Sequence, residues 1–177
     1  MTDQPATAAL RRLMGFEAGL TRLLTVIVVF LLCFSTGGAF FGVLSRYFFN
    51  TSYDFLEELC LMAVVYASLL YFGPLISRNA HLTMAFLTDR LTPTALRWYD
   101  MVLYIAMSLL LLWMLRVAWT WEMSLMKMGL TTMSGQLQAW VPSAALPAGL
   151  AIALFYAVLR VIYRLAGVPL ITAGADE

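Results

Sequence analysis

Residues 53–81 read YDFLEELCLMAVVYASLLYFGPLISRNAH, and this stretch decides the fold class. Paired carboxylates, Glu57 and Glu58, stand near its front, and no charged residue occurs from position 59 to position 76. The hydrocarbon core of a bilayer is about 30 Å thick, so roughly 20 residues of helix cross it. Because lipid offers the backbone no hydrogen bonds, a segment that crosses it satisfies its own as a helix. We therefore predict a transmembrane helix over residues 57–76.

The composition of the whole chain agrees with this prediction. The 177 residues are 62% hydrophobic and 12% charged, with a mean hydropathy of +0.84. Soluble domains are about 45–50% apolar and about 25% charged. A formal net charge of +1 argues against nucleic acid as a partner. We expect residues 1–177 to form a single membrane domain.

Three further apolar runs predict spans over residues 23–44, 101–121 and 142–162. The first run holds no charge and is longer than the apolar core of a cleavable signal peptide, which has about 7–15 residues. We therefore expect a permanent helix there. The run over residues 101–121 ends at Trp119 and Trp121, and such aromatic residues prefer the membrane boundary. The expected fold class is an all-α integral membrane protein with four transmembrane helices.

Two shorter segments have the pattern of amphipathic interfacial helices. In residues 10–22, apolar residues recur at helical spacing with charged residues largely between them. This segment either lies in the headgroup region or simply extends the first span, and the pattern leaves both alternatives open. Residues 82–91 are too few to cross a bilayer and precede Pro93, so we expect an interfacial helix there.

The two connections on the other side of the spans are expected to be irregular. Thr51, followed three residues later by Asp54, resembles a helix N-cap with an acidic third position, which suits the helix dipole. Residues 127–140 contain Gly129 and Gly135 and are expected to form a mobile loop.

Basic residues divide unevenly between the two sides of the predicted membrane. One side would hold Arg11, Arg12, Arg22, Arg78, Arg90, Arg97, Arg160 and Arg164. The other would hold Arg46 and Lys127, and also Arg116 if its side chain reaches outward. The positive-inside rule then places both termini and the middle connection in the cytoplasm.

Several chemistries do not fit this sequence. A haem held by two histidines is excluded, because His81 is the only histidine. Cys33 and Cys60 are single thiols in apolar runs, which argues against a redox pair. The sequence has no glycine-rich phosphate loop, metal cluster or nucleophile constellation. We expect no catalytic, cofactor-binding or metal-binding residue and no enzymatic activity.

Arg116 is the one charged residue well inside the third predicted span. An intramembrane charge is a functional candidate by default. It lies less than two helical turns from Trp121, so its side chain can also reach the membrane boundary or pair with another helix. We favour contact with the membrane boundary or with another helix, and a role in transport stays open as the alternative.

The charged and aromatic residues at the span ends form a pattern. Its parts are Arg46-Tyr47-x-Phe49 after the first span, Glu57-Glu58 opening the second, Arg78-x-x-His81-Leu82 closing it, and Trp140, Pro142 and Pro147 at the start of the fourth. This pattern resembles the small (Q-type, DctQ-like) membrane subunit of tripartite ATP-independent periplasmic (TRAP) transporters. The resemblance covers the full chain.

The resemblance implies a division of labour among three proteins in the bacterial inner membrane and periplasm. A periplasmic binding protein captures an organic acid or related solute, and a large (M-type) membrane subunit carries the substrate and sodium sites. The small subunit is the fixed scaffold of this sodium symport system. The alternative is an independent four-helix membrane protein, such as a homo-oligomeric channel or exporter.

A set of residues at the span ends is our candidate interface with a partner subunit or with lipid headgroups. It comprises Arg46, Tyr47, Glu57, Glu58, Arg78, His81, Arg116 and Trp140. Boundary anchoring and helix capping are the alternative roles for such residues.

Overall fold

The structure, a computed structural model, describes residues 5–77 and 93–165. Its helices are α1 (Pro5–Phe49), α2 (Asp54–Ser77), α4 (Pro93–Met128), α5 (Trp140–Ser143) and α6 (Ala145–Leu165). Within the described residues, four stretches of helix are long and apolar enough to cross a membrane. The predicted all-α membrane fold with four spans is therefore confirmed.

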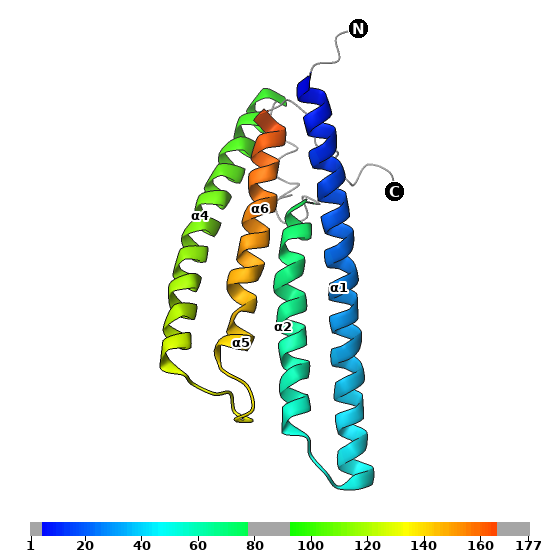
Figure 1. Cartoon of the computed structure of the whole chain (residues 1–177). Coiled ribbons are helices and arrows are strands. Elements are labelled where there is room, and N and C mark those ends of the chain that lie inside the picture. The colour runs from blue at the N-terminus through cyan, green and yellow to red at the C-terminus, as the bar shows by residue number, and fades with distance from the viewer. Residues whose placement is uncertain (1–4, 78–92, 166–177) are drawn as a thin grey trace.

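The four long segments lie side by side in the order α4, α6, α2, α1 (Figure 1). α1 packs on α2, α2 on α6, and α6 on α4. Among the described helices, α2 and α6 are therefore interior, and α1 and α4 are edges with one extensively packed neighbour each. The start of α1 and the end of α6 lie at one end, which we call the terminal end (Figure 1). The connections 50–53 and 129–139 lie at the other, the turn end.

The interior helices α2 and α6 approach each other closely because glycines stand at the contact. A Cβ atom on Gly149 would come within 2.7 Å of Leu69 Cβ and 2.8 Å of its carbonyl oxygen. A Cβ atom on Gly73 would come within 2.7 Å of Tyr156 Cδ2. Small residues that let backbones approach are typical of helix packing in membranes. Around this seam lie the fully buried side chains of Ile76, Ala153, Tyr156 and Ala157.

Helix α1 corrects one expectation. It has 45 residues and is therefore about 68 Å long, more than twice the thickness of the hydrocarbon core. Residues 10–22 belong to this continuous helix and form no separate interfacial element. They extend the first span, which was one of the two alternatives. The physical reason is that Glu17 and Thr21 both bond to other helices of the bundle, which keeps this segment in line with the span. The other predicted interfacial helix, 82–91, lies outside the described residues.

The prediction that Thr51 caps the second helix is wrong. α2 begins at Asp54, and the carbonyl oxygen of Tyr53 accepts bonds from the amides of Leu56 and Glu57 at 2.9 and 3.2 Å. The amide of Thr51 instead reaches back to the carbonyl oxygen of Ser45 at 3.5 Å. Thr51 therefore closes α1 and does not open α2.

The connection between α4 and α5 is a hydrogen-bonded hairpin, whereas the sequence suggested an irregular loop. The amide of Thr132 donates to the carbonyl oxygen of Leu137, and that of Ala139 to Leu130, both at 2.8 Å. Gly135 sits in the turn with a φ of +72°, a conformation that favours glycine. We call residues 129–139 the α4–α5 hairpin.

Candidate functional site

At the turn end, two of the predicted residues meet in an ion pair. The Arg46 guanidinium, from the last turn of α1, donates to the Glu57 carboxylate in the first turn of α2. Their side chains are 59% and 52% exposed, so this pair contributes little to stability. Next to it, Tyr47 is 84% exposed and presents its ring at the end of α1.

Glu58 and Trp140 tie the α4–α5 hairpin to the rest of the turn end. Ser134 donates from its hydroxyl to the Glu58 carboxylate, which joins the hairpin to α2. The indole Nε1 of Trp140 donates to the side-chain oxygen of Gln138. In addition, the Tyr66 hydroxyl on α2 donates to the carbonyl oxygen of Val141 in α5. The bonds of Glu58 and Tyr66 therefore fix the α4–α5 hairpin and the start of α5 against α2.

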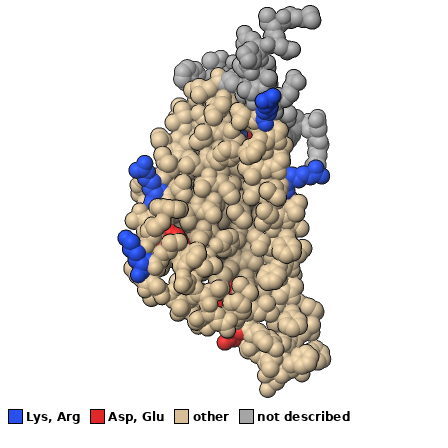
Figure 2. All heavy atoms as spheres, in the orientation of Figure 1, with Lys and Arg blue, Asp and Glu red and all other residues tan. Residues whose placement is uncertain are grey.

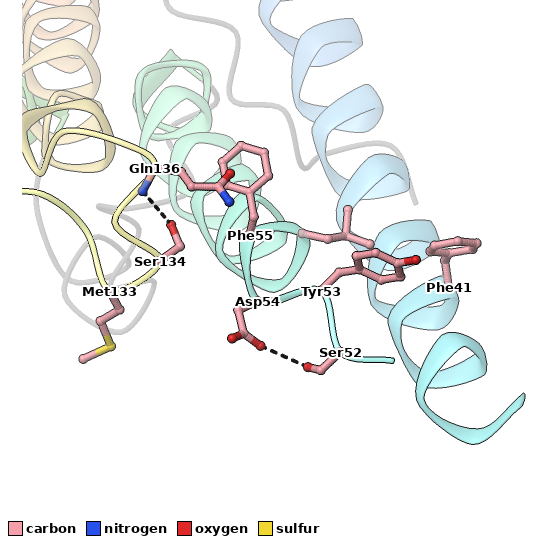
Figure 3. A pocket seen from close by; sticks show the side chains of 9 residues that line it. Phe41, Ser52, Tyr53, Asp54, Phe55, Met133, Ser134 and Gln136 are labelled. Atoms are coloured by element: carbon pink, nitrogen blue, oxygen red, sulfur yellow. Dashed lines mark hydrogen bonds between the residues drawn. The ribbon is translucent and has the colours of Figure 1, made fainter. Parts of the chain in front are cut away.

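A cavity of about 510 Å³ opens between the start of α2 and the α4–α5 hairpin. Figure 3 shows Tyr53 and Phe41 on one side of it and Ser134 and Gln136 on the other. The Phe41 and Tyr53 rings stack with centroids 6.5 Å apart, and the Ser52 hydroxyl donates to Asp54 at 3.0 Å. This cavity therefore combines aromatic walls with polar groups, which is typical of surfaces that bind a partner.

Arg116 lies apart from these residues. It is exposed on α4 and lines a second cavity, of about 710 Å³, between α4 and α6. The same cavity is lined by Glu122, whose residue surface is only 3% exposed and whose carboxylate accepts a bond from the Ser143 hydroxyl. Arg78 and His81 lie outside the described residues, so their predicted role stays a prediction.

The terminal end holds a buried polar cluster that the sequence reading did not single out. Arg160 of α6 contacts Glu17 of α1 at 3.0 Å, with side chains 12% and 10% exposed. The hydroxyl of Ser77, at the end of α2, donates to the same Glu17 oxygen at 2.7 Å. Arg160 also donates to the carbonyl oxygen of Ser77, and its Cζ lies 5.9 Å from the centre of the Tyr163 ring. Three helices are therefore joined by one ionic cluster.

The positions of the two buried acids, Glu17 and Glu122, could have been recognised from their spacing in the sequence. Glu17 precedes the buried Leu24 by seven residues, and Glu122 follows the buried Leu111 and Ala118 by eleven and four residues. Spacings of four and seven place residues on one stripe of a helix. A charged residue within an apolar stripe is the feature that would have identified them.

Comparison with known families gives a match over most of the chain. The family described as "Tripartite ATP-independent periplasmic transporters, DctQ component" matches residues 35–167. The chain belongs to this family. The resemblance drawn from the span-end pattern is therefore confirmed. Comparison with curated proteins and with solved structures returned no match.

Membership fixes the general role of the chain: a DctQ component is one part of a multi-protein transporter in a membrane. The residues that match the family include the turn end, both cavities and Arg160. Glu17 lies before the matched region, so the ionic partner of Arg160 comes from the part of α1 that the family description does not cover.

Proposed function

We propose that this DctQ component is the small scaffold subunit of a sodium-driven symport system for organic acids or related small solutes. Its partners are a large (M-type) membrane subunit, which moves the solute, and a periplasmic substrate-binding protein. The chain resides in the bacterial inner membrane with both termini in the cytoplasm, as the arginine distribution favours.

The observation that carries this proposal is the open order of the helices. In a self-contained four-helix bundle, each helix packs on two others around a shared core. Here α1 and α4 are edges, and large apolar side chains such as Phe30, Phe40 and Trp113 are 65–68% exposed along them. Helices arranged in this way offer long apolar edges to a neighbouring subunit, which supports a bracing role.

The turn end supplies a surface for the binding protein. The beginning of α2, which follows the turn 50–53, and the α4–α5 hairpin come from distant parts of the chain and are joined through Glu58 and Ser134. Between them lies the 510 Å³ cavity with its aromatic wall. In the proposed orientation this end faces the periplasm, where the binding protein docks.

Reconstitution tests the proposal. Liposomes that contain only this chain should show no sodium-dependent uptake, and addition of the large subunit with the loaded binding protein should produce uptake. Uptake by the small chain alone would refute the scaffold role. It would favour the alternative, a homo-oligomeric channel or exporter in which copies of this chain cover the open edges.

A further inference from the structure

A groove lies between α4 and α6 in the half of the bundle nearer the turn end. It is the cavity of about 710 Å³ already described. On the α6 side it is lined by compact residues at helical spacing: Ala144, Pro147, Ala148 and Ala151. Small residues on a membrane helix let the backbone of another helix approach closely. The groove therefore has a shape that suits a helix, whereas a flexible acyl chain needs no such spacing.

The walls of this groove are held in place by the chain itself. Glu122, from the α4 wall, accepts a hydrogen bond from the Ser143 hydroxyl in α5. The amide of Ala148 donates to the carbonyl oxygen of Ala144 at 3.2 Å, which joins the end of α5 to α6. A binding surface that is already formed loses little conformational freedom when its partner docks. The groove is therefore ready to receive a rigid partner.

The α4 wall carries a basic side chain inside the span. Arg116 is exposed and lines the groove, and positions 101–115 before it and 117–121 after it carry no charge. Charged side chains within spans face protein or water far more often than acyl chains. A guanidinium has several N–H donors in a fork that matches a carboxylate, so it can bind a neighbouring acid in addition to any contact within the chain. Arg116 therefore favours an acidic partner at this groove.

The two edges of the bundle differ in charge. α1 carries no charged residue from Leu23 to Ser45, and its exposed side chains there include Phe30 and Phe40. In Figure 2, basic side chains protrude from the side of the molecule where α4 lies, and the lower part of the α1 side shows none in this view. An uncharged aromatic surface suits acyl chains, whereas a basic groove does not. The charge distribution therefore distinguishes the α4 edge as the one that a protein covers.

We propose that the groove between α4 and α6 seats a transmembrane helix of the large subunit, and that this helix presents a carboxylate to Arg116. The inference rests on the proposed function, which supplies the partner, and it adds the face and the chemistry of the contact. The compact residues of α6 receive the backbone of the partner helix, and Arg116 pairs with its acid at the rim. The lipid-facing edge of the small subunit is then α1.

Photo-cross-linking in cells that also produce the large subunit tests which edge is covered. The photoreactive residue p-benzoylphenylalanine replaces Trp119, which lines the groove, or Phe30 on α1. The two positions are matched, because both carry an aromatic side chain and are 56% and 68% exposed. After illumination, we expect an adduct with the large subunit from the Trp119 position and its loss from the Phe30 position.

A second experiment identifies the acid. Lys127 is the only lysine of the chain and does not line the groove, so Lys127→Gln combined with Arg116→Lys leaves one side-chain amine, which lies in the groove. A hydrophobic carbodiimide joins this amine to a carboxylate in contact with it as an amide, and the carbodiimide takes up the water as a urea. Peptide mass spectrometry should find the amide on an Asp or Glu within a span of the large subunit. Lys127→Gln alone should give no amide from the groove.

Co-purification measures the strength of the contact. Arg116→Gln should reduce the amount of large subunit retained by the small one about tenfold, the effect of losing one hydrogen bond between charged groups. Lys127→Gln is the matched control, since it removes an exposed cation of the same helix outside the groove, and it should retain the large subunit like the unmodified chain.

Several results would overturn the inference. Adducts with the large subunit from the Phe30 position alone would place the partner on α1 and leave the proposed function standing. So would adducts from the Trp119 position with phospholipid or with a second copy of this chain alone. An amide from Arg116→Lys to Glu122 alone would refute the acidic partner. Failure of the unmodified chain to retain any large subunit would refute the proposed function as well.

Discussion

The ionic cluster at the terminal end predicts that Glu17→Gln destabilises the protein far more than its size suggests. The substitution leaves the shape nearly unchanged and keeps an oxygen that can accept from Ser77. It removes the charge that compensates Arg160, whose side chain is only 12% exposed. Removal of one partner from a buried ion pair costs about 3–5 kcal/mol, and we expect the lower end because the amide oxygen still accepts hydrogen bonds.

The assay is thermal unfolding of the purified chain in detergent, followed by tryptophan fluorescence at a fixed scan rate because such unfolding is often irreversible. For a chain of this length, 1 kcal/mol shifts Tm by about 2–4 °C, so Glu17→Gln should lower Tm by about 6–12 °C. The matched control is Glu57→Gln, which breaks the half-exposed Arg46–Glu57 pair and should cost about 0–1 kcal/mol.

A double variant separates charge burial from packing. Glu17→Met with Arg160→Met removes both charges, and it should be more stable than Glu17→Gln because no uncompensated charge stays buried. Equal shifts for Glu17→Gln and Glu57→Gln would refute the reasoning. So would a double variant that is no more stable than Glu17→Gln.

Three further predictions follow from other parts of the fold. Gly149→Ala should destabilise the α2–α6 contact by about 1–3 kcal/mol in the same unfolding assay, since its Cβ would meet backbone, while Gly42→Ala, with nothing within 4 Å, should be nearly neutral. Reporter fusions should give a periplasmic signal at Ser134 and a cytoplasmic one at Pro93, and a periplasmic signal at Pro93 would contradict the proposed orientation. Glu58→Ala removes the acceptor of Ser134, so it should speed proteolysis of the α4–α5 hairpin and lower uptake by the assembled transporter without affecting membrane insertion. Unchanged uptake would favour a capping role for Glu58.

The spans could be predicted because charged residues are costly in lipid, so each span appears in the sequence as a long apolar run with few or no charges. The uncharged run from Leu59 to Ile76 permits one interpretation, and the structure confirms it. Residues 10–22 permit two interpretations, because the same amphipathic pattern is typical of a helix on the membrane surface and of a helix at the edge of a bundle. The choice between these two interpretations depended on Glu17, whose partner Arg160 is 143 positions away.

The order of the helices was not predictable. In a soluble protein the apolar face identifies the side that packs, but in lipid the outer face is apolar too, and the contrast is lost. The candidate site shows the same limit. Arg46 and Glu57 were both predicted residues and are close in sequence, whereas the pairing of Glu58 with Ser134 joins positions 76 residues apart.

The order of the helices in space has a consequence for biosynthesis. The ribosome releases α1 and α2 first, and these two neighbours can pair as soon as both are in the membrane. α4 is released next, yet among the described helices it packs extensively on α6 alone, and α6 is the last of them to be synthesised. Until α6 has been synthesised, α4 lacks the described helix on which it packs most, and the face of α2 that packs on α6 is uncovered. A nascent chain that stops before α6 therefore leaves α4 without the helix on which it packs, which exposes it to membrane chaperones and proteases.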